Sequence, residues 1–171
     1  MVRIAKFEKV SLKQFVSDWV STFPQQSVEQ AILAYEHIQL PKRATSGSAG
    51  YDFVAPVGFE LPAGGNIKIP TGIRARIEDG WVLTIYPRSG LGFKFRFQLD
   101  NSVGVIDSDY ARSDNEGHIF LRMTNDNREG KGLRVPAGTA FAQGIFLPFG
   151  ITVDDEAQGV RNGGFGSTTK A

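Results

Sequence analysis

The chain has 171 residues, of which 41% are hydrophobic and 22% are charged, and its formal net charge is +1. These values are typical of one globular domain with a substantial core, and they exclude a disordered chain. The near-neutral charge and the lack of any ~20-residue apolar run lead us to expect neither nucleic acid nor membrane as a partner. We expect no secretion signal, because the first six residues lack an apolar region, and the absence of cysteine excludes disulfides, so we expect a cytoplasmic protein.

Residues 11–37 have the periodicity of helices. Apolar side chains recur there at helical spacing in two stretches, which a proline separates. Ser11 and Ser27 each stand three residues before a glutamine, which is the capping-box pattern of a helix start. The sequence therefore predicts a helical hairpin within an N-terminal extension of residues 1–37.

From residue 38 onward the pattern changes to short strands separated by glycine and proline turns. Many short strands without crossover helices predict an antiparallel all-β fold, which could be a sandwich, a jelly roll or a small barrel, over residues 38–150. Residues 151–171 end in a stretch with almost no apolar groups, and we expect them to form a C-terminal arm. The expected strands span residues 59–61, 66–69, 73–77, 81–86, 93–99, 118–123 and 139–147.

Five segments combine glycine with side chains suited to a nucleotide. A triphosphate carries about three to four negative charges, so its site needs cations and oriented N–H donors. A single glycine-rich turn is more often structural than functional, but five such segments in one chain are hard to explain as turns alone. The segments are Gly47 to Asp52, Pro87 to Gly92, Gly104 to Tyr110, Gly138 to Gln143 and Arg161 to Thr168.

In order and spacing these segments resemble the five motifs of the trimeric dUTPase family, of bacterial or phage type, from Leu40 to the C-terminal arm. The resemblance implies a distorted jelly-roll (β-clip) subunit and a homotrimer whose active sites combine residues of more than one subunit. It also implies Mg²⁺ as cofactor and hydrolysis of dUTP to dUMP and pyrophosphate, with water attacking the α-phosphorus. Such a dUTP diphosphatase limits uracil in DNA and supplies dUMP for thymidylate synthesis.

Two carboxylates match the reactive positions of the family. Asp107 follows an apolar stretch at a strand end and matches the aspartate that orients and deprotonates the attacking water as general base. Asp52 matches the aspartate that holds Mg²⁺ through a water molecule, in keeping with the water-rich shell of this ion. The alternative for both is a turn carboxylate, and we assign Asp109 to that structural role.

We expect residues of the second, fourth and fifth motifs to bind phosphate. Arg88 offers a planar fork of donors, Ser89 a hydroxyl and Gly90 a backbone that phosphate can approach closely. The resemblance implies further phosphate contacts from Gln143 and Arg161. The alternatives are a proline-initiated turn with a surface arginine and a solvent-facing glutamine at a strand end.

Base and sugar selection fall to a hairpin expected over residues 99–110. The resemblance implies that Asn101 contacts the base and that Tyr110 packs under the deoxyribose, leaving no room for a 2′-hydroxyl. A simple core aromatic is the alternative for Tyr110. Phe165 is expected to stack on the base as part of a lid. The uracil-pairing backbone is that of Gly104, Val105 and Ile106, and the residues closing over the phosphates are Gly166, Ser167 and Thr168.

Four features depart from the family pattern. The loop 111–116 is longer than the usual turn, which alters either a wall near the sugar or a subunit contact. Arg161 lies one residue closer to the glycine pair, and Thr169 stands where glycine is usual. The hairpin at 11–37 is outside the usual core, and we favour a packing appendage over a partner surface.

Two other functions compete with this interpretation. The dCTP deaminases share the fold but need a glutamate where this chain has Arg122, and a guanidinium cannot shuttle protons at neutral pH. Residues 93–97 alternate phenylalanine with cations, as in proteins that bind single strands. We expect instead a strand with its phenylalanines facing inward. A dUTPase-fold regulatory protein that binds a protein partner through residues 11–37 is the remaining alternative.

Overall fold

The computed structural model describes residues 2–159 and 161, in which every strand pairing is antiparallel. The helices are α1 (Leu12–Thr22), α2 (Val28–Glu36), α3 (Ser89–Phe95) and the 3-10 helix η1 (Ser108–Arg112). The strands are β1 (Ala5–Lys9), β2 (Lys42–Arg43), β3 (Tyr51–Val54), β4 (Phe59–Leu61), β5 (Asn66–Pro70), β6 (Ile73–Ile77), β7 (Trp81–Pro87), β8 (Phe97–Leu99), β9 (Gly104–Ile106), β10 (Phe120–Asn125), β11 (Leu133–Val135) and β12 (Ala140–Pro148).

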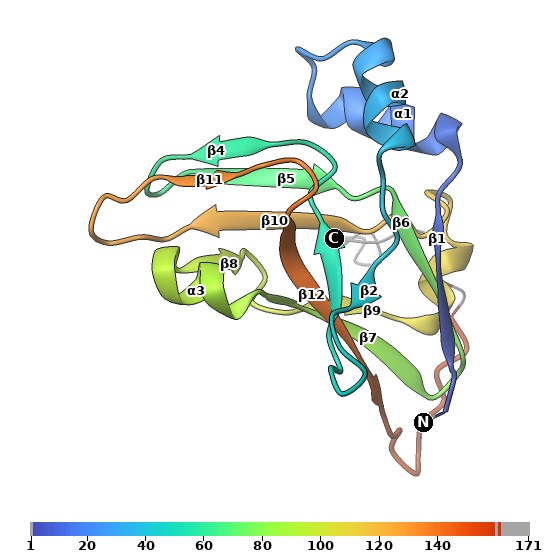
Figure 1. Ribbon diagram of the computed structural model, residues 1–171. Helices are drawn as coiled ribbons and strands as arrows, with labels where there is room; N and C mark the ends of the chain where they lie inside the picture. The colour runs from blue at the N-terminus through green and yellow to red at the C-terminus, as the bar shows by residue number, and fades with distance from the viewer. Residues whose placement is uncertain (1, 160, 162–171) are drawn as a thin grey trace.

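The strands form two larger sheets and two ribbons around one core (Figure 1). The larger sheets have the strand orders β2-β3-β12-β7-β9 and β5-β10-β8, and the ribbons pair β1 with β6 and β11 with β4. Alternate side chains of these strands point inward, as period-two strands require, and bury Phe53, Ile69, Leu83 and Phe141 completely or nearly so. The expected all-β core with an N-terminal helical hairpin is confirmed. No helix within the described part of the chain is long and apolar enough to cross a membrane.

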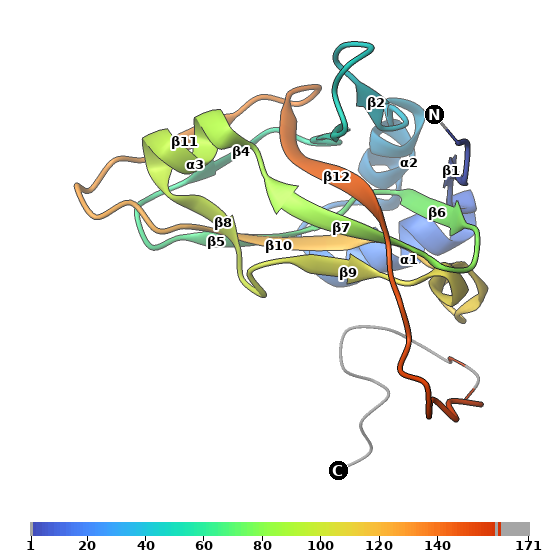
Figure 2. The same ribbon diagram turned by 90° about the horizontal axis from the view of Figure 1, so that it is seen from below.

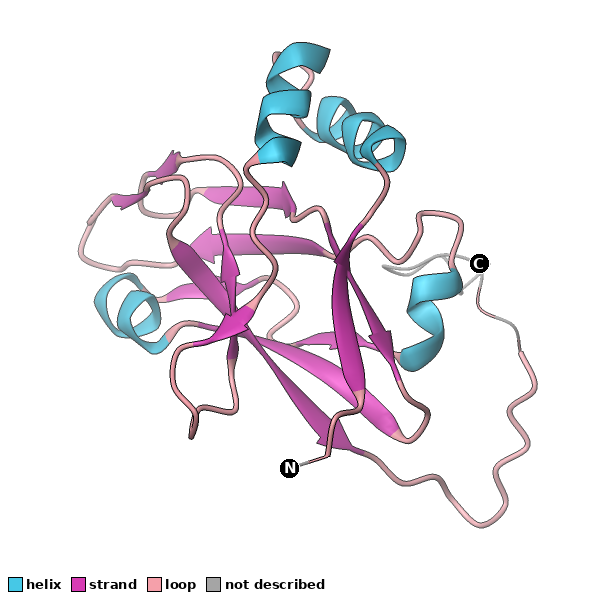
Figure 3. Ribbon diagram, turned by 45° about the vertical axis from the view of Figure 1, so that its right-hand side comes forward, coloured by secondary structure: helices cyan, strands magenta, loops and turns pink. Residues whose placement is uncertain are grey.

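The helical hairpin lies against one end of the β structure (Figure 3). Phe15 and Trp19 of α1 are fully buried, with ring centroids 5.1 Å apart, and belong to the same core as the strands. The chain before the hairpin also joins this core, because β1 pairs with β6 along its whole length. The hairpin is therefore packed on the barrel rather than tethered to it, while the boundaries at residues 37 and 151 stay predictions.

Only one of the two expected capping boxes is complete. At the start of α2, Ser27 and Gln30 exchange both bonds, at 2.8 and 3.3 Å. At the start of α1, the Ser11 hydroxyl accepts the Gln14 N–H at 3.1 Å, but the Ser11 N–H donates to the carboxylate of Glu116 instead of to Gln14. A carboxylate is a stronger acceptor than an amide, so the distant residue replaces the local one.

The expected strand over residues 93–99 is wrong in its first half. Residues from Ser89 to Phe95 form α3, which Arg96 ends in the left-handed region at φ 52°. Leu91 and Phe95 stand four residues apart and pack on the core, so the helical period prevails over the alternating one. Phe93, which we expected to face inward, is 91% exposed. The inward phenylalanine at the strand itself is Phe97, which is fully buried in β8.

Candidate active site

A pocket of about 490 Å³ opens between the two larger sheets. Strand β8 pairs with β10, whereas β9 pairs with β7 in the other sheet, so the hairpin expected over residues 99–110 is not formed. The chain instead crosses from one sheet to the other after the N–H of Asp100 donates to the carbonyl of Arg122 at 3.0 Å, and it leaves the edge of β10 uncovered beyond that bond. The pocket fills this gap. Its walls are Leu99, Asp100, Asn101, Val103, Gly104, Val105, Ile106, Tyr110, Phe120, Leu121, Arg122 and Arg161.

Backbone groups of β9 form one wall of the pocket. Among the described strands, β9 is the last of its sheet, so one row of its N–H and C=O groups has no neighbouring strand. Gly104 lets β9 lie close to β7, because a Cβ there would stand 3.1 Å from the Cβ of Ile85. Asn101 lies in the crossing turn, where its carbonyl accepts the N–H of Val103 at 2.7 Å. The predicted base-binding residues are thus brought together in one pocket.

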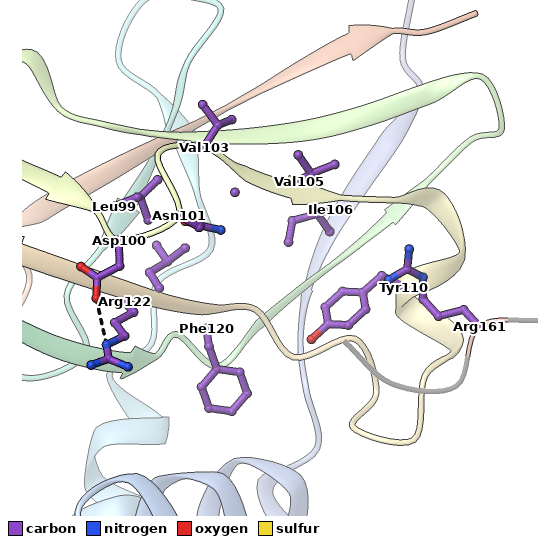
Figure 4. A pocket seen from close by; sticks show the side chains of 12 residues that line it. Leu99, Asp100, Asn101, Val103, Val105, Ile106, Tyr110, Phe120, Arg122 and Arg161 are labelled. Carbon is purple, nitrogen blue, oxygen red and sulfur yellow. Dashed lines mark ion pairs between the residues drawn. The ribbon is translucent and has the colours of Figure 1, made fainter. Parts of the chain in front are cut away.

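Tyr110 closes one end of this pocket, and the Asp100–Arg122 ion pair lies at the other end (Figure 4). The Tyr110 hydroxyl donates to the carbonyl of His118 at 2.8 Å and accepts from the amide of Asn115 at 2.9 Å. The side chain is 4% exposed, and burial raises the pKa of Tyr110 above its ordinary value. The ring is therefore a core aromatic that also lines the pocket, and its contact with a sugar stays a prediction.

Asp107 follows β9 directly and stands at the start of η1, at the Tyr110 end of the pocket. Its carboxylate is partly exposed and forms an ion pair with the guanidinium of Arg161. The Arg161 Nε also donates to Asp109 at 2.8 Å, so the two aspartates share one cation. Asp109 was expected to be structural only. The one-turn geometry of the 3-10 helix, which the sequence did not predict, brings it beside Asp107.

A second cluster forms where β3, β12 and β7 lie side by side. On β12, Gln143 pairs with Asp52 on one neighbour and with Tyr86 on the other. The Gln143 amide donates to the carbonyl of Pro87 at 3.1 Å, and the Nε of Arg88 lies 3.5 Å from the Asp52 carboxylate. The first, second and fourth motifs therefore meet. The exposed Ser89 and Gly90 follow as the first residues of α3.

The two clusters lie at opposite ends of β7. Asp107 follows Ile106, which pairs with Leu83, whereas Arg88 follows the far end of the same strand. At about 3.3 Å per residue, the five positions between Leu83 and Arg88 span about 17 Å. The general-base candidate and the phosphate-binding candidates of one chain are thus far apart.

The donors of the second cluster fit a magnesium ion that arrives with its substrate. The described residues hold no group of three or more histidine, cysteine or acidic side chains that could bind a metal. Asp52 instead offers one carboxylate, which points to the Arg88 guanidinium beside it. Mg²⁺ commonly takes one or two carboxylates, keeps several waters and completes its shell with substrate phosphates. This donor set fits such an ion and does not form an all-protein metal cage.

Sequence reasoning missed the residues that hold Tyr110. Asn115 and His118 contact its hydroxyl, and Asn115 belongs to the longer loop 111–116. The loop therefore supports a pocket wall, as one of the two expectations for it stated. Neither residue carries a motif that would have revealed it. Four predicted site residues, Phe165, Gly166, Ser167 and Thr168, lie outside the described residues.

Comparisons with known proteins agree with this geometry. A family model described as dUTPase matches residues 36–169. The deoxyuridine 5′-triphosphate nucleotidohydrolase of Lactococcus lactis is 44% identical over 134 residues, which cover 77% of this chain and 88% of that protein. A crystal structure of dUTPase from Streptococcus mutans is 40% identical, with a TM-score of 0.60 over 70% of this chain and 91% of that one.

A further structural neighbour shares the fold at low sequence identity. It is a mutant dUTPase from phage phi11 of S. aureus, described for the coordination of a structural Mg(II) ion. It is 18% identical, with a TM-score of 0.59, and the match covers 74% of this chain and 94% of that one. The family match, the close relatives and the convergence of the motif residues lead to one conclusion: this chain belongs to the dUTPase family.

Proposed function

We propose that this protein is a dUTP diphosphatase, which hydrolyses dUTP to dUMP and pyrophosphate with Mg²⁺ as cofactor. The observation that carries the proposal is the pocket, which is lined by the free edge of β9 and by Tyr110, with Asp107 directly after β9 and paired with the pocket-lining Arg161. The base and the sugar would contact the pocket wall, and the reacting phosphate would lie beside Asp107.

The β9 edge suits recognition of uracil. Uracil presents O4 as acceptor and N3–H as donor, and cytosine reverses both. Backbone N–H and C=O groups of Gly104, Val105 and Ile106 are held by pairing with β7, so they cannot exchange roles to suit cytosine. A site of this kind rejects the wrong base because buried groups would stay unpaired. Asn101 stands at the rim, where its amide can contact the base.

Tyr110 is proposed to select the sugar. Its hydroxyl is bonded from two sides and its ring is packed in the core, so it cannot swing away from the pocket. A rigid ring against C2′ of the ribose would leave no space for an added hydroxyl. Deoxyuridine nucleotides would therefore be accepted and uridine nucleotides rejected.

Asp107 is proposed to be the general base that orients water and takes its proton as the water attacks the α-phosphorus. Arg161 already contacts Asp107 and Asp109, so its guanidinium would lie near the negative charge that grows in the transition state. Arg88, Ser89, Gly90 and Gln143 would bind the β- and γ-phosphates. Mg²⁺ held through Asp52 would neutralise phosphate charge when bound.

The separation of the clusters supports active sites that combine two subunits, and the homotrimer is the assembly that the resemblance implies. A triphosphate cannot reach from Asp107 to Arg88 of the same chain if the two lie about 17 Å apart. A second subunit would bring its Arg88 cluster to the Asp107 of the first. The C-terminal arm over residues 151–171, including Phe165, would close over the site to which its Arg161 already contributes, while residues 1–37 and 38–150 form the extension and the core. We also propose a cytoplasmic location, because the chain lacks cysteine.

The test is product analysis with dUTP, dCTP, dTTP and UTP in the presence of Mg²⁺. We expect dUMP and pyrophosphate from dUTP and little from the other three. Asp107→Asn should bind dUTP but lose about 10²–10⁴ in rate, because it removes the general base and keeps the shape. Deaminated product from dCTP, or near wild-type hydrolysis by the variant, would refute the proposal.

The alternatives have less support. Deamination of dCTP lacks its proton shuttle, because Arg122 lines the pocket and is bound to Asp100 at 2.9 Å. A protein partner bound through residues 11–37 is favoured by one observation, the exposure of Val28 and Leu33 on α2. Binding of a partner would add to the hydrolytic function and would not replace it.

A further inference from the structure

Helix α1 contacts residues 110–118, the segment that carries Tyr110, on the side that faces away from the pocket. The backbone N–H and the hydroxyl of Ser11 both donate to the carboxylate of Glu116, at 2.7 and 2.6 Å. These bonds outweigh the cost of burying the charge and hold the pKa of Glu116 below its ordinary value. Figure 2 shows α1 beside the segment that follows β9. The start of α1 is therefore fastened to the last residue of the longer loop.

A second link joins the middle of α1 to the end of the same segment. The Asp18 carboxylate accepts from Nδ1 of His118 at 2.6 Å, and the opposite ring nitrogen accepts the N–H of Gly72 at 2.8 Å. The two bonds set the ring proton on Nδ1. His118 is fully buried, and Gln14 gives Asp18 a further bond at 2.9 Å. Through its two ring nitrogens, the imidazole thus connects Asp18 of α1 to the backbone of Gly72 in the β structure.

On the side that faces the pocket, atoms of the same segment hold the Tyr110 hydroxyl. The Tyr110 hydroxyl donates to the carbonyl of His118 and accepts from the amide of Asn115. The turn between them is tight, since a Cβ on Gly117 would stand 2.5 Å from the Cα of Ala111. The backbone around Gly117 is closely packed. A displacement of Glu116 or of the His118 ring should therefore also displace the Asn115 amide and the His118 carbonyl that hold Tyr110.

We propose that α1 is a clamp that positions Tyr110, and that Glu116 and Asp18 are positioning residues for sugar selection. The inference rests on the proposed function, in which Tyr110 excludes the 2′-hydroxyl. Steric exclusion of one hydroxyl depends on a fixed wall. A tyrosine released from its outer supports could retreat and admit a ribonucleotide, although none of the catalytic groups would have changed.

The test compares kcat/KM for dUTP and for UTP in clamp variants. In Glu116→Ala and Asp18→Asn we expect the dUTP-to-UTP ratio to fall about tenfold, which corresponds to about 1.4 kcal/mol. Glu116→Gln keeps one oxygen acceptor and should restore part of the ratio. A merely structural role would lower the rates for both substrates together and leave their ratio unchanged, which would overturn the clamp.

Ser27→Ala is the matched control. It removes a capping hydroxyl from the start of α2, as Ser11→Ala does from the start of α1, but the bonds of Ser27 join it to Gln30 and not to the loop 111–116. Its ratio should equal that of the wild type. If Glu116→Ala does not fold, Ser11→Ala removes only the hydroxyl bond and should lower the ratio by a smaller factor. An equal ratio in Ser11→Ala and Ser27→Ala would then overturn the proposal.

A measurement without substrate separates this inference from the proposed function. Because burial raises the pKa of Tyr110, a loosened ring in Glu116→Ala should titrate closer to an ordinary phenol. The chain has four tyrosines, so the signal is assigned by difference from Tyr110→Phe. If the wild type failed to cleave dUTP, the proposed function would be wrong, and an unchanged phenol titration would independently refute the clamp.

Discussion

Mixing two inactive variants should restore activity if each active site draws on two subunits. Asp107→Asn removes the proposed general base, and Arg88→Ala removes a phosphate-binding cation at the other end of β7. Each alone should lose at least about 10² in rate. Within one chain the two positions lie about 17 Å apart along the strand, so one nucleotide cannot use both.

The size of the recovery follows from symmetry. In a threefold trimer assembled at random from equal amounts of both variants, each site takes its Asp107 from one chain and its Arg88 from a neighbour. Each half is intact half of the time, so about one quarter of the sites are complete. The two chains are unfolded together, refolded and assayed for pyrophosphate release, beside wild type treated in the same way.

The control pairs Arg88→Ala with Gln143→Ala. These residues belong to one cluster, since Gln143 bonds to the carbonyl that precedes Arg88. Every site would then lack one of the two side chains, and mixing should restore nothing. Recovery in this control, no recovery in the test pair, or a monomeric mass by light scattering would refute the composite site.

Three further predictions concern single positions. A Cβ on Gly50 would stand 2.6 Å from Oε1 of Gln143, so Gly50→Ala should displace this amide and lower kcat/KM about fivefold, with little change in melting temperature. The buried amide of Asn125 donates to three carbonyl groups. Asn125→Ala should therefore lower the free energy of unfolding, measured in urea, by about 2–3 kcal/mol. Hydrogen bonds from Arg76 and Lys6 lower the pKa of Glu8 from 4.5 to about 2. Its stabilising effect should therefore be present above pH 4.5 and disappear as the pH falls to 2, so the stability difference between wild type and Glu8→Gln should vanish over this range.

Several parts of the protein follow from short stretches of sequence. The complete capping box at Ser27 and the apolar spacing around it are local, and they predicted α2 correctly. The strands β4 and β6 match their expected bounds because glycine and proline turns mark both of their ends. The motif residues were also visible in order along the chain. Interactions within a few residues decide such features, so a single sequence contains them.

Other parts were decided by contacts between distant residues. The Ser11 N–H turned from Gln14 to Glu116, 105 positions away, because folding placed a stronger acceptor there. Residues 93–95 joined a helix, since the core accepted the face carrying Phe95 and left Phe93 in solvent. Local alternation could not reveal which face the core would accept.

The pocket itself is a product of tertiary structure. Five motifs in sequence order indicated a nucleotide site, but not that β8 and β9 would join different sheets and leave a cavity between them. Nor could sequence show that α1 would reach His118 through Asp18, across 100 positions. Chemical groups are properties of the sequence, whereas their distances depend on strand pairing and packing over the whole chain. The chemical groups of the candidate site are therefore visible in the sequence, whereas the distance between its two clusters is set by the fold alone.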